Sequence, residues 1–228
     1  MSIPHAPLSL RALARLLSYP DAELREQLPG LREALQREGS LSPARLAALD
    51  TLIAALGSTP PLDVEADYVN LFDHGRATSL HLFEHVHGDS RDRGPAMVDL
   101  AQTYEQAGLY LAPGELPDYL PVVLEFVSTQ PPKEARAFLS EMAHIFNAIF
   151  NALQQRQSAY ASIPGALLEL AGESVQAMQS IPDEPPLDAT WAEPVVFDGC
   201  STQGQARPGH TQPIHLVRKS PPSPGAVA

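Results

Sequence analysis

Three residues in the first half of the chain have the types and spacing of a metal site. His81, Glu84 and His85 form an H-x-x-E-H pattern, in which two histidines bind zinc and the glutamate serves as a general base. On a helix, His81 and His85 would lie one turn apart on the same face. The pattern predicts a zinc-dependent hydrolase as one alternative. A polar helix end is the other interpretation, because histidine interacts favourably with the last carbonyls of a helix.

Other chemical sites have weaker support. Glu141 and His144 form a single E-x-x-H pair, whereas di-iron helical bundles need this motif on two helices. The sequence contains no G-x-S-x-G nucleophile motif and no glycine-rich phosphate loop. Cys200 is the only cysteine, so no disulfide framework or multi-cysteine metal cage is expected within the chain. Catalysis therefore rests on the histidine pattern alone, and we predict that the protein is not an enzyme.

The composition is that of an acidic globular protein. Of the 228 residues, 44% are hydrophobic and 18% are charged, which predicts one domain with a packed core. The net charge of -12 argues against nucleic acid as a partner and favours a basic one, although acidic surfaces also keep proteins soluble. No apolar stretch approaches the roughly 20 residues that span a bilayer, and the first residues do not form a secretory signal. We expect a cytoplasmic protein without direct membrane insertion.

Apolar residues recur at helical spacing along most of the chain, which predicts an all-α fold with seven or so helices. Ser42 and Pro43 suit the start of one helix, as N-cap and first helical residue. After Pro132, a wide apolar stripe from 138 to 153 predicts one long helix, and a last helix is expected from about 164 to 179. Breaks are expected at 57–61, 88–93 and 112–117, where Gly, Pro and Asp accumulate. The third break is either a hinge or a plain loop.

The last part of the chain has a different composition. Nine of the 23 prolines fall within residues 181–228, and this segment has no helical stripe of useful length. We therefore predict a helical domain over 1–180, followed by a Pro-rich and mostly disordered tail. The apolar patch at 191–197, which includes Trp191, could still dock on the bundle, because a tryptophan buries much surface when it finds a groove.

Two predicted helical segments carry aromatic and aliphatic side chains next to carboxylates. The first lies within 63–73, and the second within 118–126. An apolar floor with carboxylates at its rim would bind an amphipathic peptide that bears Arg or Lys. The alternative is that the apolar residues pack in the core while the acidic residues face water.

Both segments also belong to longer stretches that resemble a known group of proteins. The first stretch begins with Y-V-N-L-F-D-H-G-R at Tyr68 and continues with L-H-L-F-E-H-V-H-G-D-S-R-D-R-G to Gly94, and the second is L-P-D-Y-L-P-V-V-L-E-F at 116–126. They resemble the TorD/DmsD/NarJ group of redox-enzyme maturation chaperones, and most closely its NarJ branch. The order and spacing of the matches fit across about residues 8 to 180.

This resemblance implies a single TorD-like helical bundle that acts as an assembly chaperone. Such a chaperone binds the N-terminal peptide of the apo catalytic (alpha) subunit of membrane-bound respiratory nitrate reductase. It supports insertion of the molybdenum cofactor into this client and delays membrane docking, without becoming part of the final enzyme. No cofactor would stay bound to the chaperone, and molybdenum cofactor biosynthesis proteins are further expected partners. The resemblance also makes the H-x-x-E-H pattern incidental.

The resemblance further implies where a client peptide binds. In the wider group, an aromatic-x-x-Leu-Phe motif and the Asp-His of a second motif are implicated in peptide binding. Tyr119 stands where TorD-like members have this histidine, which is the form that resembles NarJ. The hinge prolines would be Pro117 and Pro121. The predicted client-binding residues are Asp67, Tyr68, Leu71, Phe72, Asp118, Tyr119, Leu124, Glu125 and Phe126, with Asp67, Asp118 and Glu125 pairing with basic side chains of the client.

Overall fold

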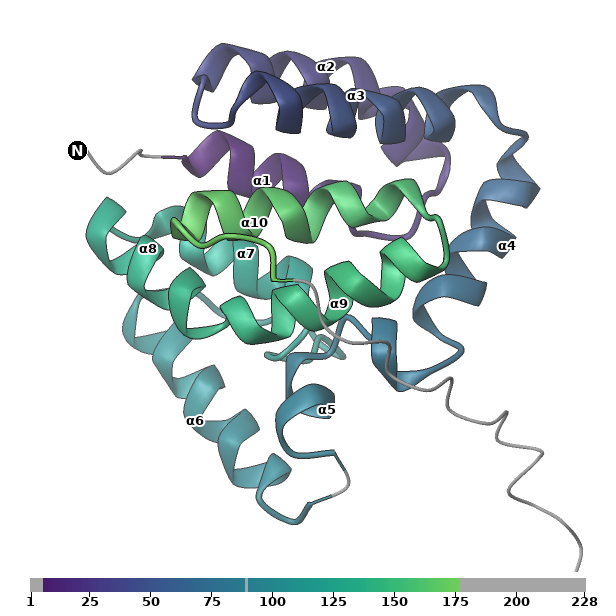
Figure 1. Ribbon diagram of the computed structural model, residues 1–228. Helices are drawn as coiled ribbons and strands as arrows, with labels where there is room; N and C mark the ends of the chain where they lie inside the picture. Colours follow the sequence, from purple (N-terminus) through teal and green to yellow (C-terminus); the bar gives the residue numbers. More distant parts are fainter. Residues whose placement is uncertain (1–5, 89, 177–228) are drawn as a thin grey trace, which may run out of the picture. The chain divides into compact units, whose positions relative to one another are not determined.

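The computed structural model describes residues 6–88 and 90–176, and these residues form a helical bundle (Figure 1). Within them there is no β-strand apart from one antiparallel bridge between His81 and Tyr119, which confirms the predicted all-α fold. The predicted tail at 181–228, its 191–197 patch and Cys200 lie outside the described residues. The helices are α1 (Pro7–Leu16), α2 (Ala22–Glu38), α3 (Pro43–Ser58), α4 (Pro61–Phe72), α5 (Leu82–Val86), α6 (Arg93–Gln106), α7 (Leu120–Thr129), α8 (Pro132–Glu141), α9 (Ala143–Gln155) and α10 (Ser162–Ala171), with 3-10 turns η1 (Arg76–Thr78) and η2 (Ala159–Ala161).

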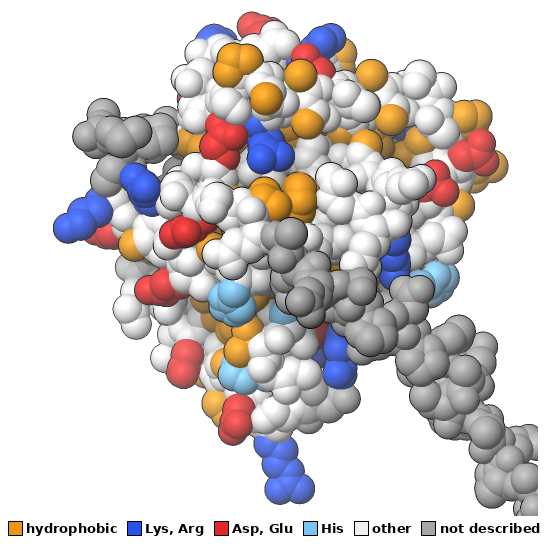
Figure 2. All heavy atoms as spheres, viewed as in Figure 1, with side chains coloured by type: hydrophobic (Ala, Val, Ile, Leu, Met, Phe, Trp, Pro, Cys, Tyr) orange, Lys and Arg blue, Asp and Glu red, His pale blue; other side chains and the backbone are white. Residues whose placement is uncertain are grey.

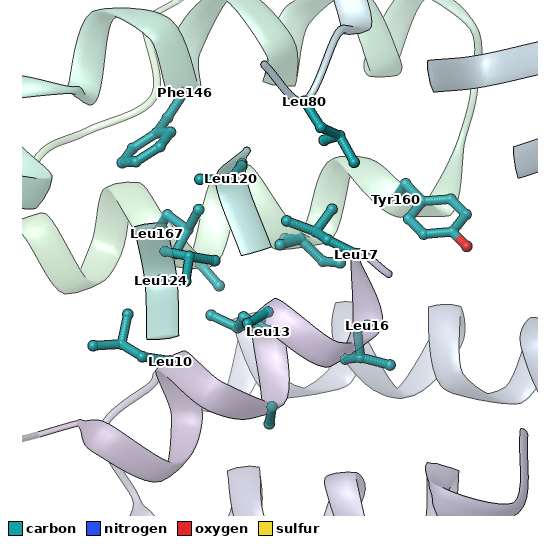
Figure 3. Close-up of a cluster of buried hydrophobic side chains, with 14 of the residues drawn as sticks. Leu10, Leu13, Leu16, Leu17, Leu80, Leu120, Leu124, Phe146, Tyr160 and Leu167 are labelled. Atoms are coloured by element: carbon teal, nitrogen blue, oxygen red, sulfur yellow. The ribbon is translucent and has the colours of Figure 1, made fainter. Parts of the chain in front are cut away.

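The core forms where α1, α7 and α10 meet. Helix α1 packs against α7 and α2, while α10 packs against α9, α8 and α3, so these helices lie between the α2–α3 pair and the α8–α9 pair in Figure 1. Figure 3 shows Leu10 and Leu13 of α1, and Leu17 directly after α1, on the side that faces Leu124 of α7 and Leu167 of α10. All five side chains are buried. Burial of a leucine stabilises a fold by roughly 1.5–3 kcal/mol, so this contact fixes where α7 lies.

Arginine side chains close the C-terminal ends of three helices. Arg25 donates hydrogen bonds to carbonyls at the end of α3, Arg136 donates to Ala171 at the end of α10, and Arg156 donates to carbonyls at the end of α4. A cation at this position also interacts favourably with the helix dipole. These three arginines therefore stabilise the fold. Acidic side chains, in contrast, are spread over the molecular face in Figure 2.

The start of α3 was predicted correctly, whereas the number of helices was not. Ser42 caps α3, with its hydroxyl accepting a hydrogen bond from Arg45 N–H, and Pro43 is the first helical residue. The expected seven or so helices are ten in the described residues. Helices α2 and α6 were not anticipated. The stripe at 138–153 divides into α8 and α9 at Met142. Both halves pack on α10, but their further neighbours differ: α8 also contacts α7, whereas α9 contacts η1 and η2.

The last helix is shorter than predicted. It ends at Ala171 rather than near 179, because Gly172 takes a left-handed conformation with φ of 80°. The N–H groups of Gly172 and Glu173 turn back to carbonyls of Glu169 and Leu168, a glycine-terminated motif that closes many helices. No helix in the described residues is long and apolar enough to cross a membrane.

Candidate functional site

Asp118 joins the segment around α5 to the start of α7. Its side chain is fully buried, and its carboxylate accepts a hydrogen bond from Phe83 N–H at 3.2 Å. The same carboxylate lies 3.3 Å from Nδ1 of His81 and 3.6 Å from a guanidinium nitrogen of Arg93, at the start of α6. Buried carboxylates are stable only when they are paired and hydrogen-bonded. We call Asp118, His81, Phe83 N–H and Arg93 the Asp118 cluster.

The histidines of the H-x-x-E-H pattern have structural partners in this region. His81 precedes α5 with extended backbone angles, so it does not share a helical face with His85. The hydrogen bond to Asp118 raises the pKa of His81, whereas burial lowers the pKa of His85, whose Nε2 lies 2.9 Å from the carbonyl oxygen of Ser79. Histidines gather near α5 and α9 in Figure 2. Across residues 6–88 and 90–176, no three His, Cys, Asp or Glu side chains are arranged to bind a metal, so the hydrolase alternative gains no support.

The two segments that carry the predicted site meet through a pair of tyrosines. The hydroxyl of Tyr68, on α4, lies 3.3 Å from the hydroxyl of Tyr119, next to α7. Tyr68 donates its proton to the carbonyl of Leu17 at 2.7 Å, which leaves Tyr119 as the donor between the two. Tyr68 also packs against Phe72 and Tyr160. Burial raises the pKa of Tyr68, so this is a neutral, packed aromatic cluster inside the fold.

A groove of about 400 Å³ lies along α7, apart from the tyrosine pair. Its floor consists of Val122, Glu125, Phe126 and Thr129. These positions follow i, i+3, i+4 and i+7, which places them on one face of a helix. The other wall consists of Tyr104 of α6 and Leu109, Tyr110, Leu111 and Glu115 of the following loop, and Arg11 of α1 lies at the rim. We call this surface the α7 groove.

Local sequence sets the wall of the α7 groove. Helix α6 ends because Gly108 takes a φ of 80°, which turns the chain toward α7. Tyr104 anchors this wall: its hydroxyl donates to the carbonyl of Pro117 at 2.8 Å, and its ring centre lies 4.7 Å from that of Phe126. Tyr110, in contrast, is 80% exposed although it lines the groove. The groove therefore has a fixed aromatic floor and an aromatic side chain available to a partner.

The predicted client-binding residues divide between the interior and the surface. Glu125 is exposed in the α7 groove, and Asp67 is exposed on α4. Phe126 also lines the groove, although it is buried. Leu71 and Tyr119 are half-buried. Four further residues are buried and would contact a client only if the bundle opened: Tyr68, Phe72, Asp118 and Leu124. The predicted hinge prolines Pro117 and Pro121 are also buried, and Pro121 lies in the first turn of α7.

The sequence of this chain matches a known protein family. The model of the nitrate reductase delta subunit family matches residues 18–163, a span that includes the Asp118 cluster and all of the α7 groove except Arg11. The chain belongs to this family. This confirms the predicted NarJ-type membership.

Relatives of this delta subunit family match over most of the chain. The nitrate reductase molybdenum cofactor assembly chaperone NarJ of Escherichia coli K12 is 44% identical over 82% of this chain and 83% of its own. The protein named probable assembly chaperone NarJ of Bacillus subtilis is 31% identical over 79% and 97%. A candidate redox enzyme maturation protein from Archaeoglobus fulgidus shares the fold, with a TM-score of 0.54 at 20% identity over 74% of this chain and 95% of that one. The relatives are named as chaperones rather than enzymes, in agreement with our prediction.

Several groove residues of this family member were not anticipated from the sequence: Arg11, Tyr104, Leu109, Tyr110, Leu111, Glu115, Val122 and Thr129. A signal was present for the floor, because Val122, Glu125, Phe126 and Thr129 share a helical face. For the wall, the sequence indicates only that no helix is expected, because its loop overlaps the predicted break at 112–117. Arg11 lies far from the groove in sequence and reaches it only through the packing of α1 on α7.

Proposed function

We propose that this chain is an assembly chaperone for a membrane-bound respiratory nitrate reductase, and that its client is the apo catalytic (alpha) subunit. It binds the N-terminal peptide of the client in the cytoplasm, keeps the subunit ready for insertion of the molybdenum cofactor, and delays its membrane docking. Molybdenum cofactor biosynthesis proteins are further partners in this proposal. The names of the 44% identical relatives support the nitrate reductase client. The α7 groove is the single structural observation that carries peptide binding.

The chemistry of the α7 groove fits an amphipathic peptide. Phe126 and Val122 offer an apolar floor, and Tyr110 can cover the apolar side of a bound segment. Glu125 is exposed, and within the described residues its carboxylate makes no hydrogen bond or ion pair, so it is available to a Lys or Arg of the client. Recognition of a helix by a groove uses this combination of apolar anchors and charged edges.

The remaining predicted residues support the groove in this proposal. Leu124 holds α7 against α1 from the opposite face, and Asp118 together with Tyr119 holds the start of α7. Asp67 and Leu71 form a second contact surface on α4. Leu62, which is 78% exposed, lies in the first turn of the same helix on another face. Masking an apolar targeting segment requires release after maturation. A folded client that no longer presents this segment binds the chaperone less well, so folding of the client shifts the equilibrium toward release.

Calorimetric titration with a synthetic N-terminal peptide of the cognate catalytic subunit tests the proposal. We expect binding at micromolar affinity or tighter by the native protein. Tyr110→Ala should weaken it at least tenfold, the effect of an aromatic anchor at an interface, roughly 1.4 kcal/mol or more. Leu62→Ala is the matched control, because it removes an equally exposed apolar side chain from α4. Neither change touches the core, so thermal unfolding should stay unchanged.

The possible results separate the two surfaces. Weaker binding by Tyr110→Ala alone supports the α7 groove, whereas weaker binding by Leu62→Ala alone moves the site to the first turn of α4. No binding by the native protein would refute the proposed client. The same titration at increasing salt tests the carboxylates, because ions screen exposed charge pairs. Equal affinity at low and high salt would remove the electrostatic part of the proposal.

A further inference from the structure

The α7 groove carries charges of both signs. Arg11 reaches it from α1, where its Nε donates a hydrogen bond to the hydroxyl of Ser128 at 3.1 Å. Glu125 precedes Ser128 by three residues, about one helical turn or 5 Å along α7. Glu115 lies across the groove, and its carboxylate accepts a hydrogen bond from Ala112 N–H at 2.9 Å.

These opposite charges do not neutralise one another. Over residues 6–88 and 90–176, no ion pair joins Arg11 to Glu125 or Glu115, although both carboxylates line the same groove. Arg11 uses its Nε toward Ser128, and no bond within the described part engages its two terminal nitrogens. A guanidinium fixed at one nitrogen and open at the other two is suited to a carboxylate of a partner.

We propose that the α7 groove selects its occupant by the order of charges along it, an inference that rests on the proposed function. Glu125, together with Glu115, receives a cationic side chain, and Arg11 receives a carboxylate about one turn further toward the C-terminal end of α7. The preferred occupant is thus an amphipathic helix with one basic and one acidic residue beside its apolar face. Arg11 is the specificity-determining residue, because it disfavours a purely basic peptide that the net charge of -12 would otherwise attract.

Three designed helical peptides test this inference. Each has about 18 residues, five turns of helix, with the same face of leucines and two variable positions four residues apart beside it. These positions carry Lys and Lys, Lys and Glu, or Glu and Glu. An exposed ion pair contributes roughly 0.2–1 kcal/mol, and a like-charge contact opposes binding by a similar amount. The Lys/Glu peptide should therefore bind the native protein about fivefold more tightly than either of the others.

Reversing one protein charge should reverse the preference. In Arg11→Glu the groove has only negative charges, so the Lys/Lys peptide should become the tightest ligand. Arg91→Glu is the matched control, because Arg91 is an exposed arginine outside the groove and its replacement changes the net charge equally. Circular dichroism of Arg11→Glu checks that loss of the bond to Ser128 leaves the fold intact.

Each outcome has a distinct meaning. The inference is overturned if the native protein prefers Lys/Lys, if it binds all three peptides equally, or if it binds none of them. It is also overturned if Arg11→Glu and Arg91→Glu keep the same order of preference. The client peptide is titrated alongside: its failure to bind would refute the proposed function, whereas client binding combined with any of the results above would refute only the charge order.

Discussion

Asp118 and Glu125 lie seven residues apart, and the sequence predicts the same role for both, as carboxylates that pair with a basic client. In the structure their surroundings are opposite. Asp118 is fully buried and contacts His81, Arg93 and a backbone N–H. Glu125 is exposed in the α7 groove, and its carboxylate has no partner within the described residues. The carboxylate of Asp118, just before α7, thus stabilises the fold, whereas the carboxylate of Glu125, within α7, is available for binding.

The difference follows from where each residue stands relative to α7. Asp118 precedes the helix and lies against the start of α5, where the N–H of Phe83 donates to its carboxylate and the N–H of Leu82 donates to its backbone carbonyl. Glu125 lies on the face of α7 that lines the α7 groove and is exposed there. A carboxylate costs several kcal/mol to bury without partners. Only the position with ready donors can therefore be interior.

Replacing Asp118 or Glu125 with alanine tests whether the two carboxylates contribute differently to stability. Asp118→Ala leaves the guanidinium of Arg93 and the N–H of Phe83 without their buried acceptor, so we expect a loss of about 3 kcal/mol in the free energy of unfolding. Glu125→Ala should change it by less than about 0.5 kcal/mol, as is usual for exposed side chains. Urea unfolding followed by circular dichroism measures both values. Equal stability of the two variants would contradict the distinction.

Tyr104 and Tyr110 differ in the same way as Asp118 and Glu125, one being buried and the other exposed, but the expected difference in stability is smaller. Tyr104→Phe removes the hydrogen bond to the buried carbonyl of Pro117, which should cost about 1–2 kcal/mol. Tyr110→Phe should leave stability unchanged, because the side chain of Tyr110 is 80% exposed. Thermal unfolding of both variants, compared with native protein, measures the difference. A loss of stability confined to Tyr110→Phe would show that the wall of the groove is anchored elsewhere.

Fold class and several helix starts could be predicted from the sequence, because they depend on local signals. Ser42 and Pro43 announce α3, and the i, i+4, i+7, i+8 stripe from Val64 to Phe72 marks α4. The break at Met142 had no such signal, since methionine neither favours a turn nor prevents a helix. Tertiary packing sets that break. Gly172 is a local signal for the end of α10, but the apolar pattern continues beyond it at Val175 and Met178, which favours a longer helix.

The site was only partly predictable, because periodicity marks a helical face as apolar without saying what covers it. Glu125 and Phe126 were identified, yet Leu124 next to them points into the core. The loop wall with Tyr110 has no periodic pattern, and Arg11 comes from a helix more than 100 positions away in the sequence. Such contacts depend on how the helices pack, and local sequence patterns do not reveal this packing at the level of individual side chains.

The smallest expected effect concerns pH, through His81 of the Asp118 cluster and the nearby His85. Asp118 raises the pKa of His81 above its ordinary value of 6.5, with Glu84 raising it further and Arg93 lowering it. A base whose pKa is higher in the folded state stabilises the fold below 6.5, and this contribution is lost as pH rises through the folded value. Burial lowers the pKa of His85, so its contribution has the opposite sign: it is present above 6.5 and is lost as pH falls.

Urea unfolding of native protein, His81→Gln and His85→Gln at about pH 6 and about pH 8, on either side of the ordinary histidine pKa, separates the two contributions. Native protein should exceed His81→Gln in stability by more at the lower pH, and should exceed His85→Gln by more at the higher pH. The first difference should be smaller than the losses expected for Asp118→Ala and Tyr104→Phe, because the side chain of His81 is 32% exposed and water screens its charge. A pH-independent difference between native protein and His81→Gln would mean that Arg93 and Phe83 N–H alone hold the Asp118 carboxylate, and that His81 is neutral beside it.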